Sequence, residues 1–280
     1  MNKEKKTKDK KGEKGIKIVN IYCVLIIVSI ILFVLGIKAT GVFQSVLFSF
    51  AINLITSLVI IFFVDLNLEK KAKKAEEKQA RALEISQIKS CHSLIKPVLS
   101  IYTLEFNQLT TPINDRTQNG EFLPINADTL NKDFKLKDLR DILSIDITVY
   151  GRLGNTILET YEVIHQRMTD NFANMLFLCK FKYYPEIANA VSDIVNLANM
   201  PTSIDTLCTL KDNQGLKAVL NNMLDSYEGD PEKDLAEDKY SGNIFLCYIL
   251  IYNHLKKMQQ ALDKYCSLIS ELITEAENEI

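Results

Sequence analysis

Three histidines, His92, His165 and His254, are the side chains of this chain best suited to acid–base or metal chemistry, and they lie far apart in the sequence. Imidazole titrates near neutral pH and ligates transition metals. His92 and His254 fall in or beside apolar helical patterns, where a structural histidine with satisfied hydrogen bonds is expected. None of the three lies in a catalytic motif, so the sequence predicts no catalytic residue and no enzymatic activity.

The segment before His165 matches one half of a di-metal carboxylate signature. Glu162 follows Glu159 and lies one helical turn before His165, a spacing at which Glu and His can reach one ion. The full signature needs a second Glu-x-x-His pair, which the chain lacks. Gly151 and Gly154 lack the third glycine and the lysine of a phosphate-binding loop, and we expect them to allow close helix packing. No metal site and no cofactor are predicted.

The cysteines show neither a C-x-x-C pair nor a close cluster. Such spacing favours reduced, buried thiols in a cytosolic compartment over a disulfide framework or a zinc site. The six are Cys23, Cys91, Cys179, Cys208, Cys247 and Cys266.

Charge is distributed unevenly along the chain. Residues 1–38 contain nine Lys and three acidic residues, whereas residues 82–280 contain 18 basic and 28 acidic residues. The basic N-terminal part is therefore expected to contact a lipid bilayer with anionic headgroups. An acidic domain repels a phosphate backbone, so no nucleic-acid contact is predicted for the distal part.

Two uncharged apolar segments, residues 18–37 and 42–64, follow a basic leader at 1–17. At 1.5 Å per residue they are about 30 and 34 Å long, enough to span a bilayer. Because only four residues join them, we expect an antiparallel transmembrane hairpin. Lysines flank both ends, which predicts a multi-pass protein of the bacterial inner membrane with both termini cytoplasmic. A cleaved signal peptide fits less well, because the apolar stretch is long and Ile37 stands where a small residue is preferred.

Polar residues recur on one face of the second apolar segment: Ser45, Ser49, Asn53 and Thr56, at steps of four, four and three. An amide in hydrocarbon is costly unless it finds a partner. The stripe is thus expected to pack within the hairpin or to associate between copies, around a small pore if several copies assemble; lipid exposure is the third alternative. A homo-oligomer follows from the second interpretation.

The residues after Asp65 are rich in Ala, Glu, Lys and Leu and predict a juxtamembrane helical stalk over 65–106. Its lysines near the membrane, Lys70, Lys71, Lys73 and Lys74, can contact lipid headgroups. Apolar residues from Ile85 to Phe106 take heptad spacing, and Pro97 is expected to kink this helix or to start a new one. Residues 107–131, with Asn119-Gly120, predict an irregular loop or a small hairpin.

A cytoplasmic helical domain is predicted over 132–280, with helices at 136–143, 148–180, 185–199 and 215–227 and a long terminal helix. That last helix has a heptad seam that packs either within the chain or as a coiled coil between chains. The seam residues are Tyr248, Ile251, Leu255, Met258, Leu262, Tyr265, Ile269 and Leu272. The predicted fold class is all-α: a transmembrane hairpin, a stalk and a cytoplasmic helical bundle.

The basic leader, the two spans joined by a minimal turn and the abrupt passage from FFVD into a charged helix resemble the two-transmembrane effector proteins of bacterial anti-phage systems, such as those accompanying some retrons. The resemblance covers roughly residues 1–90. It implies a cytoplasmic part held in check until a trigger frees it, after which the spans assemble and compromise the inner membrane. It transfers no catalytic residues.

Two functions of different classes follow. The first is a non-enzymatic membrane effector that associates through the polar stripe and is controlled by a protein regulator or trigger. The second is a membrane-tethered scaffold or sensor, in which the hairpin is only an anchor and the helical domain binds a protein through residues 107–131 and the terminal heptad.

Overall fold

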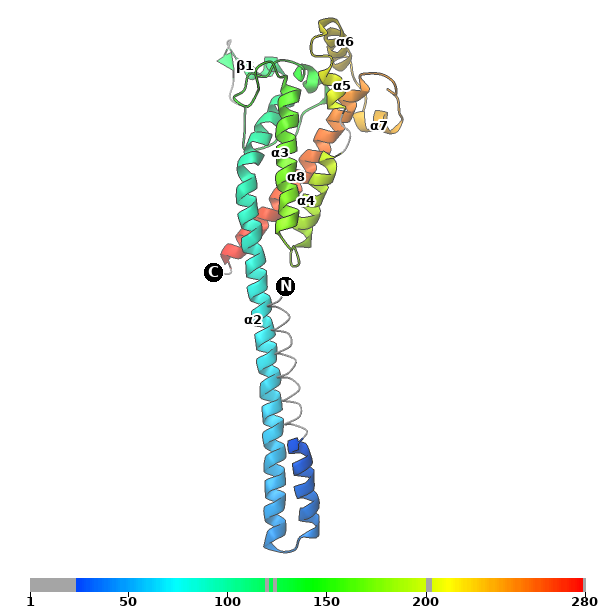
Figure 1. The fold of residues 1–280 in the computed structure, drawn as a ribbon. Helices are drawn as coiled ribbons and strands as arrows, with labels where there is room; N and C mark the ends of the chain where they lie inside the picture. Colours follow the sequence, from blue (N-terminus) through cyan, green and yellow to red (C-terminus); the bar gives the residue numbers. More distant parts are fainter. Residues whose placement is uncertain (1–23, 119–120, 123–124, 200–202, 279–280) are drawn as a thin grey trace. The chain divides into compact units, whose positions relative to one another are not determined.

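The computed structural model of the chain describes residues 24–118, 121–122, 125–199 and 203–278 (Figure 1). The expected leader at 1–17 and the first six residues of the first apolar segment lie outside the described residues, as does the Asn119-Gly120 turn. Apart from turns and loops, the described residues are helical, with one pair of two-residue strands and one isolated bridge. The chain divides into two compact units, residues 1–80 and 81–280, and we describe each by itself.

The first unit contains two apolar helices. One is described over Val24–Lys38, and after a turn at Gly41, whose φ is +71°, the helix α2 begins at Val42. α2 is a single α-helix, Val42–Leu109, and Pro97 lies inside it without ending it. Among the described helices α2 alone is both long and apolar enough to cross a membrane. No residue of the apolar part of either helix is charged. Most of their large side chains are exposed within the unit, because two helices cover only one face of each other.

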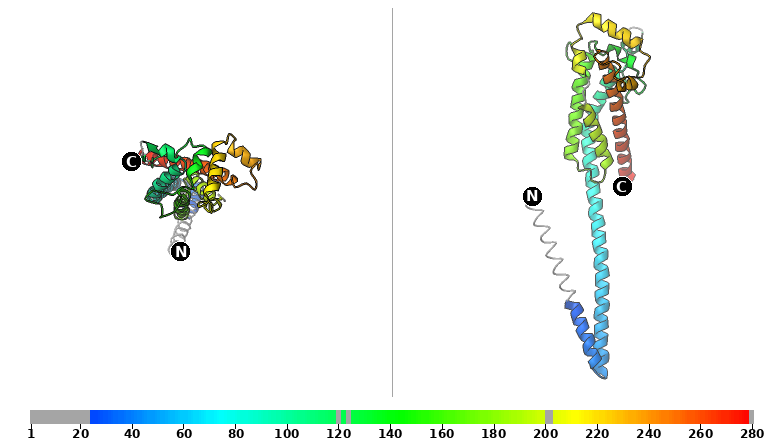
Figure 2. Two further views of the ribbon diagram at one scale, coloured as in Figure 1. Left: turned by 90° about the horizontal axis from the view of Figure 1, so that it is seen from above. Right: turned by 90° about the vertical axis from the view of Figure 1, so that its right-hand side faces the viewer.

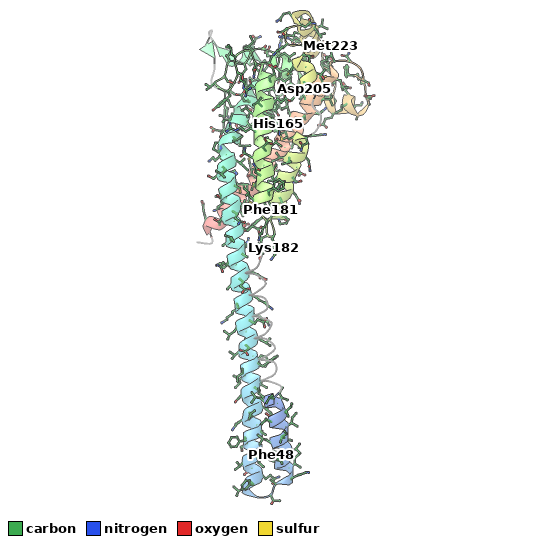
Figure 3. All side chains as sticks on the ribbon, in the orientation of Figure 1. Phe48, His165, Phe181, Lys182, Asp205 and Met223 are labelled. Atoms are coloured by element: carbon green, nitrogen blue, oxygen red, sulfur yellow. The ribbon has the colours of Figure 1, made fainter. Side chains whose placement is uncertain are left out.

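The first helix contacts α2 through small residues. Ser29 and Ala51 are almost fully buried, and Gly36 lies so close to α2 that a Cβ there would be 3.4 Å from the Phe48 ring. The ring of Phe33 meets that of Phe48 edge to face, with 5.1 Å between centroids; Phe48 is labelled in Figure 3. Small side chains let apolar helices approach closely, so van der Waals contact holds this pair together.

The described part of the second unit contains the remainder of α2, eight further helices and the strand pair. The 3-10 helices η1 (Ile113–Arg116) and η2 (Leu136–Asp141) flank the antiparallel strands β1 (Thr117–Gln118) and β2 (Glu121–Phe122). The α-helices then follow in order, and Figure 2 gives two further views of their packing. They are α3 (Ile157–Leu178), α4 (Pro185–Ala198), α5 (Ile204–Cys208), α6 (Gln214–Asp225), α7 (Pro231–Ala236) and α8 (Leu246–Asn278).

One hydrophobic core fills this unit. α4 packs against both α3 and α8, and the apolar face of α2 contributes Ile88, Ile95, Tyr102 and Phe106, each at most 2 % exposed. The Tyr102 and Tyr161 hydroxyls, on α2 and α3, are hydrogen-bonded at 2.9 Å inside that core. Full burial of an aromatic side chain removes a large apolar area from water, so these rings contribute strongly to folding.

The expected helix over 148–180 begins later than predicted, at Ile157. Thr156 is its N-cap, and the Thr156 and Glu159 side chains each accept from the other's backbone N–H. Gly151 lies in the preceding loop, where a Cβ would stand 2.6 Å from Asp146 Oδ2. The expectation that Gly151 and Gly154 serve helix packing was therefore wrong: the first leaves room for a carboxylate, and the second has a φ of +84°.

Residues 107–131 close onto the end of α2 through one side chain. Asn107 Nδ2 donates to the carbonyls of Asn126 and Thr129, both at 2.7 Å, and its Oδ1 accepts from Asn131 N at 2.7 Å. A buried amide with three short hydrogen bonds fixes both ends of this loop.

Candidate membrane-helix interface

Most of the polar stripe of α2 faces away from the described part of the first helix, and Asn53 lies at the edge of the stripe, in a groove that also includes Leu25 of that helix. Ser45, Ser49, Asn53 and Thr56 are all exposed within the first unit, whereas Ala51 is fully buried. Ser49 and Asn53 each stand two residues from Ala51, which at about 100° per residue places them on the opposite side of the helix. Against the described residues 24–38 of the first helix the stripe is not buried, and any packing of the stripe against residues 18–23 concerns residues outside those described.

The members of the stripe differ in whether their side chains already make hydrogen bonds. Ser45 Oγ donates to the Val42 carbonyl at 2.9 Å, and Thr56 Oγ1 donates to the Ile52 carbonyl at 2.9 Å. These hydroxyls satisfy themselves against the helix backbone, as hydroxyls in apolar helices commonly do. The Asn53 amide makes no hydrogen bond to any described residue. It keeps two donors and one acceptor available to a partner.

Asn53 also has a central position. It lies eleven residues from Val42 and eleven from Val64, the ends of the uncharged segment, so about 16 Å of helix extends on either side. It borders a shallow groove together with Leu25, Phe50, Leu54, Ser57, Leu58 and Ile61. A carboxamide at that depth in hydrocarbon is expensive unless another polar group meets it.

The lysines expected to meet lipid headgroups, Lys70, Lys71, Lys73 and Lys74, are exposed on the same helix. Lys73 forms an ion pair with Glu69 one turn away at 3.1 Å, both side chains being largely exposed. Such a pair is worth little in water and leaves the ammonium accessible. All four ammonium groups are therefore accessible to lipid headgroups.

The terminal heptad lies in the core of the second unit. All eight seam residues of α8 are at most 3 % exposed. Tyr265 shows how they pack: its ring meets that of Phe172 at 4.9 Å, and its hydroxyl lies 3.0 Å from His92 Nδ1 on α2. The within-chain alternative of the sequence analysis is thus the one observed, since side chains buried this way are not available to a coiled coil between chains.

The histidines do not assemble a metal centre. Glu159 caps α3 and forms an ion pair with Lys211 at 3.0 Å, and these contacts outweigh its desolvation and lower its pKa. His165 instead points into the core, edge to face with His254. Across the described residues no group of three or more His, Cys, Asp or Glu side chains is arranged to hold an ion. The ring nitrogens of His254 have no hydrogen-bond partner among them, contrary to the satisfied histidine we expected.

Two surfaces of the second unit were not anticipated from the sequence. One is the loop between η2 and α3, which exposes four large apolar side chains: Ile145, Ile147, Val149 and Leu153. The alternation of apolar and polar residues over 145–149 resembles a half-buried strand, so the sequence gives no sign of this exposure. The other is a polar cavity at the start of α3 and α6, whose basic residues are too far apart in sequence to form a recognisable motif.

Comparison of the chain with protein-family models, with curated proteins and with solved structures finds no match. The functional argument therefore stands on the geometry of this chain.

Proposed function

We propose that the chain is a bacterial inner-membrane protein whose two apolar helices form a transmembrane hairpin, with both termini cytoplasmic and the second unit acting as a cytoplasmic helical domain. The same proposal assigns it a non-enzymatic effector role of the anti-phage type. A trigger or protein regulator releases the helical domain, and the hairpins of several copies then associate and perturb the membrane.

The observation that supports this function is the unpartnered, exposed Asn53 amide in the middle of an uncharged 23-residue segment. Because all four stripe residues stay exposed beside the described part of the first helix, the stripe is available to a second copy. Two facing Asn53 side chains can exchange hydrogen bonds and remove the cost of an unpaired amide in hydrocarbon. Two spans in one chain cannot enclose a channel, so any pore needs several copies.

Association between copies can be measured directly. Full chains carrying donor or acceptor fluorophores are mixed in lipid vesicles, and energy transfer is followed as the lipid-to-protein ratio rises. Asn53→Leu is expected to weaken association about 3- to 30-fold, which corresponds to about 0.6–2 kcal/mol for an interhelical hydrogen bond in a bilayer. Gln44→Leu, a polar residue of the same helix outside the stripe, is the matched control. Equal energy transfer in the two variants would remove the support for the stripe.

The tethered scaffold remains the second candidate, and the exposed loop before α3 favours it. Val149 is 95 % exposed and Leu153 is fully exposed, on an otherwise well-packed unit. Contiguous exposed apolar side chains are typical of protein-binding surfaces. Replacing residues 18–64 by an unrelated two-helix anchor separates the two functions, because a tether tolerates the exchange and an associating hairpin does not.

A further inference from the structure

The described part of the second unit contains a cavity of about 730 Å³ where η2, the start of α3 and the start of α6 meet. It lies wholly within this unit. Its volume falls in the range of small-molecule sites, roughly 300–1,000 Å³. Apolar side chains, including Leu143 and Ile145, contribute to its wall, and polar groups of Ser144, Gln214 and Asn221 border it.

Positive charge is concentrated at this cavity although the domain around it is acidic. Arg140, Lys211 and Lys217 line it, against a single lining carboxylate, that of Asp212. Residues 82–280 carry 28 acidic and 18 basic side chains, so a cavity lined by three cations and one acid departs from its surroundings. Arg140 and Lys211 are each paired with a carboxylate outside the lining, so the charge that can attract an anion here is chiefly that of Lys217.

Two of the cations, Arg140 and Lys211, form ion pairs with carboxylates that do not line the cavity. Arg140 Nη1 lies 3.1 Å from Asp225 Oδ1, and Lys211 Nζ lies 3.0 Å from Glu159 Oε1. Neither carboxylate lines the cavity. These ion pairs orient the cationic groups without filling the space in front of them, which lowers the entropic cost of binding a ligand there.

The third cation, Lys217, is not neutralised. Its Nζ donates to the Leu143 carbonyl at 3.2 Å, and no carboxylate of the described residues lies within 4.0 Å of it. An ammonium has three donors, so at least two remain for a ligand. Lys217 stands in the first turn of α6, the twelve-residue helix Gln214–Asp225, where the helix dipole also favours negative charge.

Further donors without partners complete the lining. In α6 the Asn213 side chain accepts from Leu216 N, whereas the amides of Gln214 and Gly215 make no hydrogen bond to a described residue. Tyr248 lines the same cavity and is 1 % exposed, and its hydroxyl has no hydrogen-bond partner in the described parts of the chain. This hydroxyl is therefore available to a ligand atom or an ordered water.

We infer that this cavity is a binding site for a small phosphate-bearing ligand of nucleotide size, with Lys217, Arg140 and Lys211 on the phosphate oxygens and the Tyr248 hydroxyl as a further donor. The inference rests on the second unit alone and is independent of the proposed membrane function. Such a ligand would be a chemical signal read by the helical domain.

Binding is tested on the full chain in nanodiscs of zwitterionic lipid, by calorimetry with inorganic phosphate, pyrophosphate and ATP as probes. Lys217→Ala is expected to weaken binding about ten- to hundredfold, because a charge-assisted hydrogen bond to the ligand is lost. Lys264→Ala is the matched control: it makes the same charge change at an exposed lysine that pairs with Asp193 and does not line the cavity. It should leave the affinity unchanged.

Tyr248→Phe distinguishes a ligand contact from a structural role. It keeps the buried ring and removes only a hydroxyl that bonds nothing else described, so we expect weaker binding by about two- to tenfold with an unchanged unfolding midpoint. Nanodiscs containing phosphatidylglycerol form a second arm. A Lys217-dependent response to that lipid alone would assign the site to a headgroup and overturn the soluble ligand. Absence of binding by all three probes, or equal affinity in Lys217→Ala and Lys264→Ala, would overturn the site itself.

Discussion

The imidazole rings of His165 and His254 lie edge to face in the core of the helical unit, with 5.2 Å between their centroids. The pKa of His165 is lowered to about 3 and that of His254 to about 4, chiefly by burial, with smaller contributions from the neighbouring His254 and Lys257 respectively. Both rings are therefore neutral in the folded protein at any pH near neutrality. The unfolded chain binds protons at these sites with the ordinary pKa of about 6.5.

This difference predicts loss of stability in mild acid. A folded-state pKa below the unfolded one means that the unfolded chain takes up protons first, so the stabilisation is complete above pH 6.5 and falls as the pH drops toward 4. Between pH 6.5 and 5 the expected loss is about 2 kcal/mol for each histidine. Denaturant unfolding of the full chain in detergent, followed by circular dichroism at several pH values, measures it.

Substitution of His254 sharpens that test. Its ring nitrogens have no partner among the described residues, so His254→Leu should raise the free energy of unfolding by about 1 kcal/mol and flatten the pH dependence. His92→Leu is the contrasting variant, because His92 Nδ1 lies 3.0 Å from the Tyr265 hydroxyl and its loss should destabilise by a similar amount. A destabilised His254→Leu would mean that the ring is bonded in solution.

A thiol pair connects α2 to the end of α3. Cys91 Sγ and Cys179 Sγ lie 3.6 Å apart, and a disulfide needs about 2.05 Å, a small approach for two side chains. Burial and the neighbouring Cys91 raise the pKa of Cys179 to about 12, so little thiolate is present near neutral pH. We expect diamide to oxidise the pair slowly and faster at higher pH, with each bond formed costing the protein two hydrogen atoms by mass spectrometry. Cys91→Ser should abolish the Cys179-containing crosslink; a crosslink of Cys179 to Cys266 instead would contradict the geometry.

The capping box at the start of α3 is the third element to test. Thr156 Oγ1 accepts from Glu159 N at 3.2 Å, and Glu159 Oε2 accepts from Thr156 N at 2.7 Å. Thr156→Ala should lower the free energy of unfolding by about 1 kcal/mol. Thr274→Ala, at an exposed threonine inside α8, serves as the control and should change it by less than about 0.5 kcal/mol. Equal effects would show that the cap contributes nothing.

The long helices were accessible from the sequence because their apolar residues repeat with helical period. The seam from Tyr248 to Leu272 could be placed to the residue, and α4 and α6 to within two residues. In the seam from Ile85 to Phe106, by contrast, Ile85, His92 and Leu99 are only half-buried. The all-helical class was confirmed, and the membrane reading is supported to the extent that α2 is long and apolar enough to cross a bilayer.

Short elements and special loops were not predicted for physical reasons. The start of α3 was placed nine residues early, although the Thr156 and Glu159 pair is a capping signal that the sequence carries. The short helices α5 and α7, of five and six residues, bury too few side chains to show a period. Gly151 could not be assigned because its reason, the carboxylate of Asp146, comes from tertiary contact.

For the candidate sites too, features set by local spacing could be predicted and features set by tertiary contact could not. The stripe from Ser45 to Thr56 follows from spacing alone, but its direction relative to the first helix depends on which small residues, Ser29, Gly36 and Ala51, form the contact. The cationic cavity brings together residues from positions 140 to 248, and no local pattern predicts such a gathering. That the ring nitrogens of His254 lack hydrogen-bond partners likewise depends on which side chains surround the ring.

We propose that the exposed face around Asn53 lets copies of this chain associate and perturb the membrane. The most direct test of this proposal is the membrane potential of bacterial cells, read with a potential-sensitive dye after induced expression of the wild type, Asn53→Leu or Gln44→Leu at matched protein levels. We predict depolarisation by the wild type and by Gln44→Leu, and an unchanged potential with Asn53→Leu. Full depolarisation by Asn53→Leu, or an unchanged potential with the wild type, would contradict the account.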